Sequence, residues 1–127
     1  VSTYGGSSAV GTAAVAARRD HKHGLAASTT GITKGLVYVV NDGTHVAASA
    51  QNITSTAKTT TGTYLITWAT DFGSANYIML TTVDAGDTRV ANVRNMAAGT
   101  VNVNVYASDS ASTLEDSNFM VAAWGAE

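Results

Sequence analysis

From Leu36 onward, hydrophobic and polar residues alternate in short stretches, as they do in β-strands that bury one face. The alternation is clearest in TYLITWA at 63–69 and TVNVNVY at 100–106, where large apolar residues occupy every second position. The run LVYVV at 36–40 is apolar throughout, which predicts a strand buried on both faces. Seven or eight short strands are therefore predicted, the second and third being the weakest, at 36–40, 44–49, 52–57, 63–69, 77–82, 88–95, 100–106 and 118–124.

The first 35 residues lack this alternation. They begin with a Gly- and Ser-rich stretch, and the Ala-rich segment TAAVAARR at 12–19 is too short to form a stable helix by itself. No strand–helix–strand rhythm appears later in the chain, and 127 residues suffice for one domain with its own core. We therefore expect an all-β, antiparallel β-sandwich over residues 36–127, preceded by an extended segment over residues 1–35.

Composition narrows the classes of partner. Charged residues make up 13% of the chain, about half the usual share, which suggests that another copy of the chain covers part of the surface. The net charge is −2 and the seven basic residues are too scattered to neutralise a row of phosphates, so nucleic acid is not an expected partner. No apolar run approaches the roughly 20 residues of a membrane-spanning helix, so no membrane insertion is expected. Because the chain begins at Val1 and not at Met, we expect a fragment or a processed product.

His21-Lys22-His23 is the sharpest local motif. In an extended segment, both imidazoles would lie on the same side of the chain. Two histidines are too few for a metal site in a monomer, but three chains around an axis would offer six nitrogens, which suits octahedral iron, nickel or a similar ion. Two solvated histidines are the alternative interpretation of the same spacing.

Catalysis has little support in the sequence. The chain has no cysteine, and no serine stands in a G-x-S-x-G motif. His45 has only a loosely placed Asp42 nearby, so a surface or hydrogen-bonded structural histidine is the favoured interpretation. Carboxylates in two predicted loops could bind calcium or form a glycosidase pair, although solvated loops are more common; they are Asp84 and Asp87 in one loop, and Asp109, Glu115 and Asp116 in the other. We therefore expect a non-catalytic protein.

The aromatic residues allow two interpretations. Together they could form a platform on which sugars stack, or they could fill the core of the sandwich, which is the usual place for aromatic residues in strands. The core is favoured for Trp68 and Phe119, and Tyr38 and Tyr106 are candidates for exposed positions. The residues considered for a platform are Tyr64, Trp68, Tyr77, Phe119 and Trp124.

Two sets of residues resemble a known family. The segment 11–24 resembles the G-T-A-x-x-A-A-R-x-D-H-x-H-G element found in phage tail fibre and tail-associated proteins. The later part of the chain is similar to the tips of such fibres, with G-x-Y-x-I-x-W at 62–68, Asn76-Tyr77 and F-x-V-x-x-W-G at 119–125. The first motif is the more specific of the two, and together they cover most of the chain.

This resemblance implies a homotrimeric tip of a phage tail fibre, located on the virion, that binds a bacterial cell-surface receptor, either a glycan or a protein. It implies that residues 1–35 form a collar or trimerisation segment and that His21 and His23 bind an iron-like ion on the trimer axis. Here the HxH motif occurs once, whereas long-fibre tips repeat it. A collar that registers three chains without metal is therefore the alternative.

Receptor contacts are expected in loops, because loops on a rigid sandwich commonly carry recognition. The predicted receptor-binding residues are Asp84, Asp87, Thr88, Asp109, Glu115 and Asp116, with residues 58–61 as a third region. Two other functions stay open at this point. One is a structural collar or adaptor of a virion, and the other is the carbohydrate-binding domain of a phage depolymerase.

Overall fold

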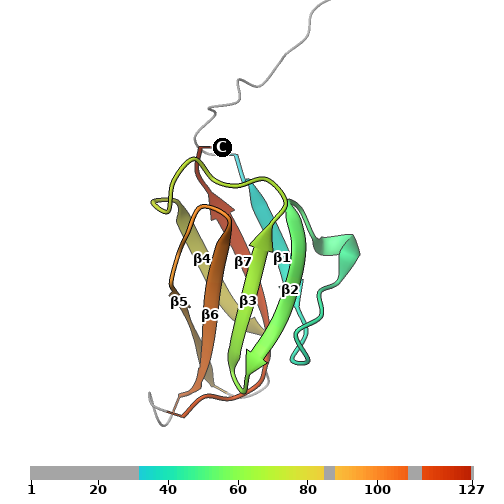
Figure 1. Ribbon diagram of the computed structural model, residues 1–127. Helices are drawn as coiled ribbons and strands as arrows, with labels where there is room; N and C mark the ends of the chain where they lie inside the picture. Colours follow the sequence, from blue (N-terminus) through green and yellow to red (C-terminus); the bar gives the residue numbers. More distant parts are fainter. Residues whose placement is uncertain (1–31, 85–87, 109–112, 127) are drawn as a thin grey trace, which may run out of the picture.

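The computed structural model of the chain describes residues 32–84, 88–108 and 113–126. They form seven strands in two antiparallel sheets that face each other (Figure 1). The first sheet has the order β1 (Gly35–Val39), β7 (Asn118–Trp124), β4 (Ile78–Asp84). The second sheet has the order β2 (Ile53–Thr60), β3 (Thr63–Trp68), β6 (Thr100–Ala107), β5 (Arg89–Arg94). The predicted antiparallel β-sandwich is confirmed.

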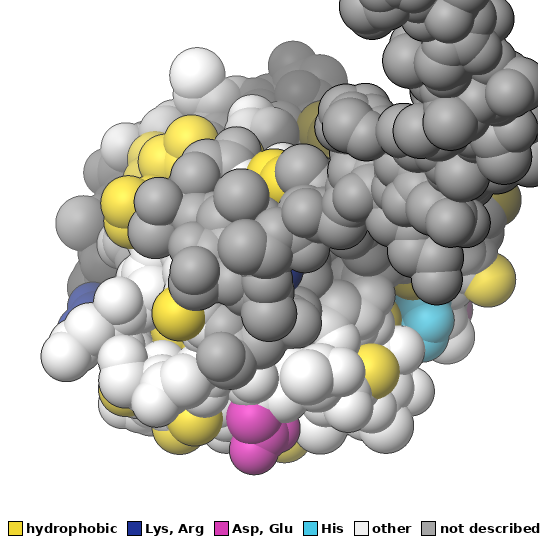
Figure 2. Space-filling view, turned by 90° about the horizontal axis from the view of Figure 1, so that it is seen from above, with side chains coloured by type: hydrophobic (Ala, Val, Ile, Leu, Met, Phe, Trp, Pro, Cys, Tyr) yellow, Lys and Arg dark blue, Asp and Glu magenta, His cyan; other side chains and the backbone are white. Residues whose placement is uncertain are grey.

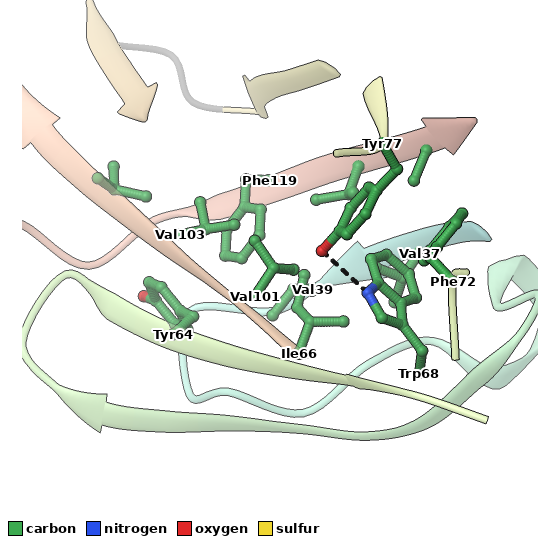
Figure 3. Close-up of a cluster of buried hydrophobic side chains, with 13 residues drawn as sticks. Val37, Val39, Tyr64, Ile66, Trp68, Phe72, Tyr77, Val101, Val103 and Phe119 are labelled. Carbon is green, nitrogen blue, oxygen red and sulfur yellow. Dashed lines mark hydrogen bonds between the residues drawn. The ribbon is translucent and has the colours of Figure 1, made fainter. Parts of the chain in front are cut away.

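Alternation along the strands determines which residues enter the core between the sheets. β3 buries every second residue, as predicted, and β6 does the same. The first sheet contributes the inner residues of β1 and β7. The buried side chains meet in one cluster (Figure 3), which consists of Val37, Val39, Tyr64, Ile66, Trp68, Phe72, Tyr77, Val101, Val103, Val105, Phe119, Val121 and Ala123.

An aromatic cluster closes one end of this core. Phe72 stacks on Tyr77 with ring centroids 4.1 Å apart, and Trp68 meets Phe72 edge-on at 5.2 Å. The Trp68 indole Nε1–H donates a hydrogen bond to the Tyr77 hydroxyl at 3.2 Å (Figure 3). Burying these large rings stabilises the sandwich, and the hydrogen bond satisfies the indole donor that burial removes from water.

The prediction that 36–40 is buried on both faces is wrong. Val37 and Val39 point into the core, but Leu36 on the opposite face keeps 39% of its surface exposed. The apolar run therefore places hydrophobic side chains on a face that no other part of the described chain covers.

The predicted strand at 44–49 is also wrong. Only an isolated bridge joins His45 to Val39, and Ala47–Ser49 form the short 3-10 helix η2. A second bridge joins Gln51 to Leu36, so residues 46–50 loop out opposite residues 37–38. The segment follows the free edge of β1 without pairing along it, because it has more residues than the edge can match.

The strand directions give the sandwich two different ends. β1 begins and β7 finishes at the end that we name the entry end, at the top of Figure 1. At the opposite end, named the loop end, lie the turns 40–44 and 60–63 and the segments that follow β4 and β6. Figure 2 views the molecule from the entry end, where the coloured side chains are mostly scattered hydrophobic ones and few are charged.

Candidate functional site

Four of the predicted receptor-binding residues lie together at the loop end. Asp84 is the last residue of β4, and Thr88 comes just before β5. Glu115 and Asp116 lie in the segment that leads into β7. The strand order brings both segments to the same end, because β4 and β6 run toward it and β5 and β7 run away from it.

The other predicted sites fall outside the described ranges. These are two loop carboxylates, Asp87 and Asp109, and both histidines of the HxH motif, His21 and His23. The third predicted region, residues 58–61, is at the loop end, where β2 turns into β3.

Asp116 connects this turn to the segment before β7. Its carboxylate accepts hydrogen bonds from the Lys58 ammonium group and, at 2.8 Å, from the backbone N–H of Gly62. The hydrogen bond from Lys58 is the main cause that lowers the Asp116 pKa below its usual value, and the Gly62 N–H adds to it. Asp116 therefore stays ionised and acts as a tether between two loop segments.

Tyr64 links the loop end to the core. Its ring is fully buried and meets Phe119 edge-on, with centroids 4.9 Å apart. Its hydroxyl donates to the Asn41 carbonyl oxygen at 3.1 Å and accepts a hydrogen bond from the Ser117 N–H at 3.3 Å. Burial raises the pKa of Tyr64 to about 12. The neutral Tyr64 phenol therefore links the segments around Asn41 and Ser117 to β3 at the loop end.

Gly62 makes the close approach at this end possible. Its φ is +65°, in the left-handed region, and a Cβ here would lie 2.7 Å from the backbone nitrogen of Glu115 and 2.8 Å from the carbonyl oxygen of Val105. Any side chain would push the segment before β7 away from the sandwich. This glycine is the first residue of the G-x-Y-x-I-x-W pattern. Close packing against Glu115 and Val105 explains why the pattern has a glycine at this position.

Two further carboxylates at this end have partners. The Arg89 Nε–H donates to Glu115 at 2.9 Å, in a pair that is partly open to solvent. The Tyr38 hydroxyl donates to Asp84 at 2.6 Å across the outer side of the first sheet. Each described carboxylate of the predicted site is thus bound to a residue from another segment: Asp84 to Tyr38, Glu115 to Arg89 and Asp116 to Lys58.

Other interpretations of single residues have clear outcomes. His45 Nδ1 lies 3.1 Å from the Thr56 hydroxyl, as expected of a structural histidine. Of the five aromatic residues considered as a sugar-stacking platform, Trp124 alone has its side chain on an outer face, whereas the other four are in the core. Within the described ranges, no three His, Cys, Asp or Glu side chains are grouped as they would be around a metal ion.

A second surface region was missed by sequence reasoning. The outer side of the first sheet, which we name the apolar face, carries hydrophobic side chains from all three of its strands. The most exposed are Ile78 at 67% and Leu80 at 62%, both on β4. The residues that define the apolar face are Leu36, Tyr38, Ile78, Leu80, Met120, Ala122 and Trp124.

A groove borders this face beside β1. It lies between the outer side of β1 and the loop around η2, and its volume is about 750 Å³. The walls are formed mainly by Leu36, Tyr38, Val46 and Met120, and Ala48 lies on the η2 side. Groove and apolar face therefore form one continuous hydrophobic surface.

The sequence did contain a signal for this surface. The segments 36–40, 77–82 and 118–124 each contain a run of consecutive apolar residues, and all three belong to the same sheet. A strand that is apolar on both sides usually has a layer of protein on each side. The strand order, which the sequence does not reveal, was needed to see that these runs lie side by side.

Comparisons with models of protein families, with curated proteins and with solved structures find no match for this chain. No helix in the part of the chain that the structure describes is long and apolar enough to cross a membrane.

Proposed function

We propose that this chain is the distal tip of a phage tail fibre, which acts without catalysis, associates as a homotrimer and binds a glycan or protein on the bacterial surface. The observation that carries the proposal is the gathering of described receptor-binding candidates at the loop end, away from the start of β1. The fibre-like motif at 11–24 precedes β1 in sequence, so a fibre shaft would approach from the entry end. The loop end would then point toward the bacterium.

Two features of the loop end favour recognition. Its carboxylates and the Tyr64 hydroxyl hold the segments in place, so binding a receptor would require little ordering of these residues. Three copies on one tip would also multiply weak contacts, because linked sites raise apparent affinity without new interactions.

A pair of matched variants tests the loop end. Thr61→Arg adds a long charged side chain at the exposed β2–β3 turn, and Ala75→Arg adds the same side chain to an exposed loop at the entry end. We expect Thr61→Arg to weaken binding to intact host bacteria by about tenfold, which corresponds to roughly 1.4 kcal/mol, and Ala75→Arg to leave it unchanged. Fluorescence-detected binding of the labelled chain to cells measures both.

Three results would count against parts of this proposal. Equal binding by both variants and the parent chain would remove the β2–β3 turn from the site. Absence of binding to any host cell by the parent chain would favour the structural collar. Binding to purified capsular polysaccharide but not to cells stripped of capsule would favour the carbohydrate-binding domain of a depolymerase.

The metal ion is a separate part of the proposal. His21 and His23 would bind an iron-like ion shared by three chains, and both lie outside the described ranges. We expect elemental analysis of the purified chain to find about one transition-metal ion per three chains. A metal content far below this ratio would remove the ion and leave the rest of the proposal intact.

A further inference from the structure

Among the residues that the structure describes, no second layer of protein covers the apolar face. β1, β4 and β7 carry hydrophobic residues on both sides, yet only their inner sides are covered by the second sheet. Monomeric proteins rarely leave such a contiguous hydrophobic area in water. The one charged residue in the strands of the first sheet is Asp84, at the loop end of β4, where it accepts a hydrogen bond from Tyr38.

One side of this face carries its most exposed side chains, and the other side borders a groove. On β4, Ile78 and Leu80 are the most exposed large hydrophobic side chains of the described residues and form a ridge. On the β1 side lies the groove beside η2, whose walls include Leu36 and Val46. The ridge and the groove have the same apolar chemistry, and the exposed ridge side chains are free to enter a groove of another copy.

The strand register places the ridge and the groove at the same height. Leu80 pairs with Ala122, and Ala122 pairs on its other side with Leu36. These three residues thus form one row across the sheet, perpendicular to the strands. A rotation about an axis parallel to the strands brings the ridge of one copy to the groove of another without a shift along the axis. Contacts between different patches close into a ring when the rotation closes and involves no such shift.

We propose that the apolar face is the interface between copies of this chain, with Ile78 and Leu80 of one copy seated in the β1–η2 groove of the next. This rests on the homotrimer of the proposed function and names the surface that forms it. A second copy fits better than a glycan or a charged partner, because the face offers hydrophobic side chains and the same chain supplies the complementary ridge.

The primary test places a charge at the centre of the interface. Leu80→Glu puts a carboxylate on the ridge, and Val90→Glu makes the same change at the 49% exposed Val90 on the outer side of the other sheet. Both positions are exposed in the single chain, so both variants are expected to fold, which circular dichroism checks. We expect light scattering of the full chain to give a trimer mass for the parent and for Val90→Glu, and a monomer mass for Leu80→Glu.

Two further variants test the ridge-to-groove contact itself. Ala48→Phe fills the groove without adding charge, and Ala57→Phe is its control on the outer side of β2. We expect at least a tenfold weaker association for Ala48→Phe and no change for Ala57→Phe. The double variant Leu36→Lys with Leu80→Glu is expected to recover association at low ionic strength, because the opposite charges face each other between copies.

The outcomes separate the interface from the trimer. A parent chain that is monomeric at all concentrations overturns both. A trimer that persists in Leu80→Glu and Ala48→Phe overturns this interface and leaves the homotrimer. A parent dimer that Leu80→Glu dissociates retains the interface and overturns the homotrimer.

Discussion

The two outer faces of the sandwich are built from strands of similar length, but they differ in chemistry. The outer side of the second sheet is mostly polar: Asn92 pairs with Asn104 and Arg94 with Asn102 across β5 and β6, and the hydrophobic Val90 and Leu65 stand among polar neighbours. The outer side of the first sheet carries Leu80, Met120 and their neighbours. Both sheets bury the same kind of inner residues, so the core alone does not require this difference. It reflects what each outer face meets: water on one side and, in our proposal, a second copy on the other.

The largest expected change is in the free energy of unfolding, and it distinguishes the inner side of β7 from its outer side. Phe119 and Met120 are neighbours on β7, the first fully buried and the second 39% exposed on the apolar face. In a Leu80→Glu background, where the face is uncovered, Phe119→Ala should lower the free energy of unfolding by about 3–5 kcal/mol. Met120→Ala should lower it by less than about 1 kcal/mol. Urea unfolding measures both changes; equal losses would mean that the apolar face is packed within the single chain.

Tyr64, on the inner side of β3, is expected to make the free energy of unfolding depend on pH, with an effect of intermediate size. The folded-state pKa of Tyr64 is about 12, raised by burial from an unfolded value of about 10. The neutral phenol therefore contributes stability that is fully present below pH 10 and is lost as the pH rises toward 12. Tyr64→Phe keeps the ring and removes the titratable hydroxyl group. The free energy of unfolding of this variant should therefore fall less between pH 10 and 12 than that of the parent chain. Parallel curves for the parent and the variant would contradict this role.

The smallest expected effect compares one tyrosine on each outer face. Tyr38 donates to Asp84, and this bond is the main cause that raises the Tyr38 pKa. Tyr106 accepts a hydrogen bond from Asn104, which is the main cause that lowers the Tyr106 pKa. Ultraviolet titration of Tyr38→Phe and Tyr106→Phe against the parent chain should show that Tyr106 ionises at the lower pH. The reverse order would mean that the covering copy or the loops change these environments.

The sequence predicted the sandwich well where alternation was strong. The patterns at 63–69 and 100–106 gave two strands and their inward residues, because one buried face imposes a period of two. The pattern was misleading at 44–49, where the edge of β1 needed only two bridges and left the remaining residues to loop out. Local propensity does not record how many residues an edge can accommodate.

The candidate site was only partly accessible to sequence reasoning. The loops with Asp84 and Asp116 were identified by composition, but their meeting at one end depends on strand order, which pattern alone does not give. The tether role of Asp116 needed the left-handed turn at Gly62, and the link through Tyr64 needed the register of β3. These contacts join residues between 23 and 54 positions apart, beyond the reach of any local pattern.

The segment between β6 and β7 is fixed at both of its junctions. The Ala107 N–H donates to the Thr113 carbonyl oxygen at 3.0 Å, and the Ser108 N–H donates to the Thr88 carbonyl oxygen at 3.1 Å. Residues inserted between Ser108 and Thr113 would therefore start and finish at positions that the sandwich already holds together. Inserting residues between two positions that are already held together adds little entropy cost, since this cost grows only slowly with length. The protein thus has a natural place to accept new sequence, such as a deliberately grafted peptide.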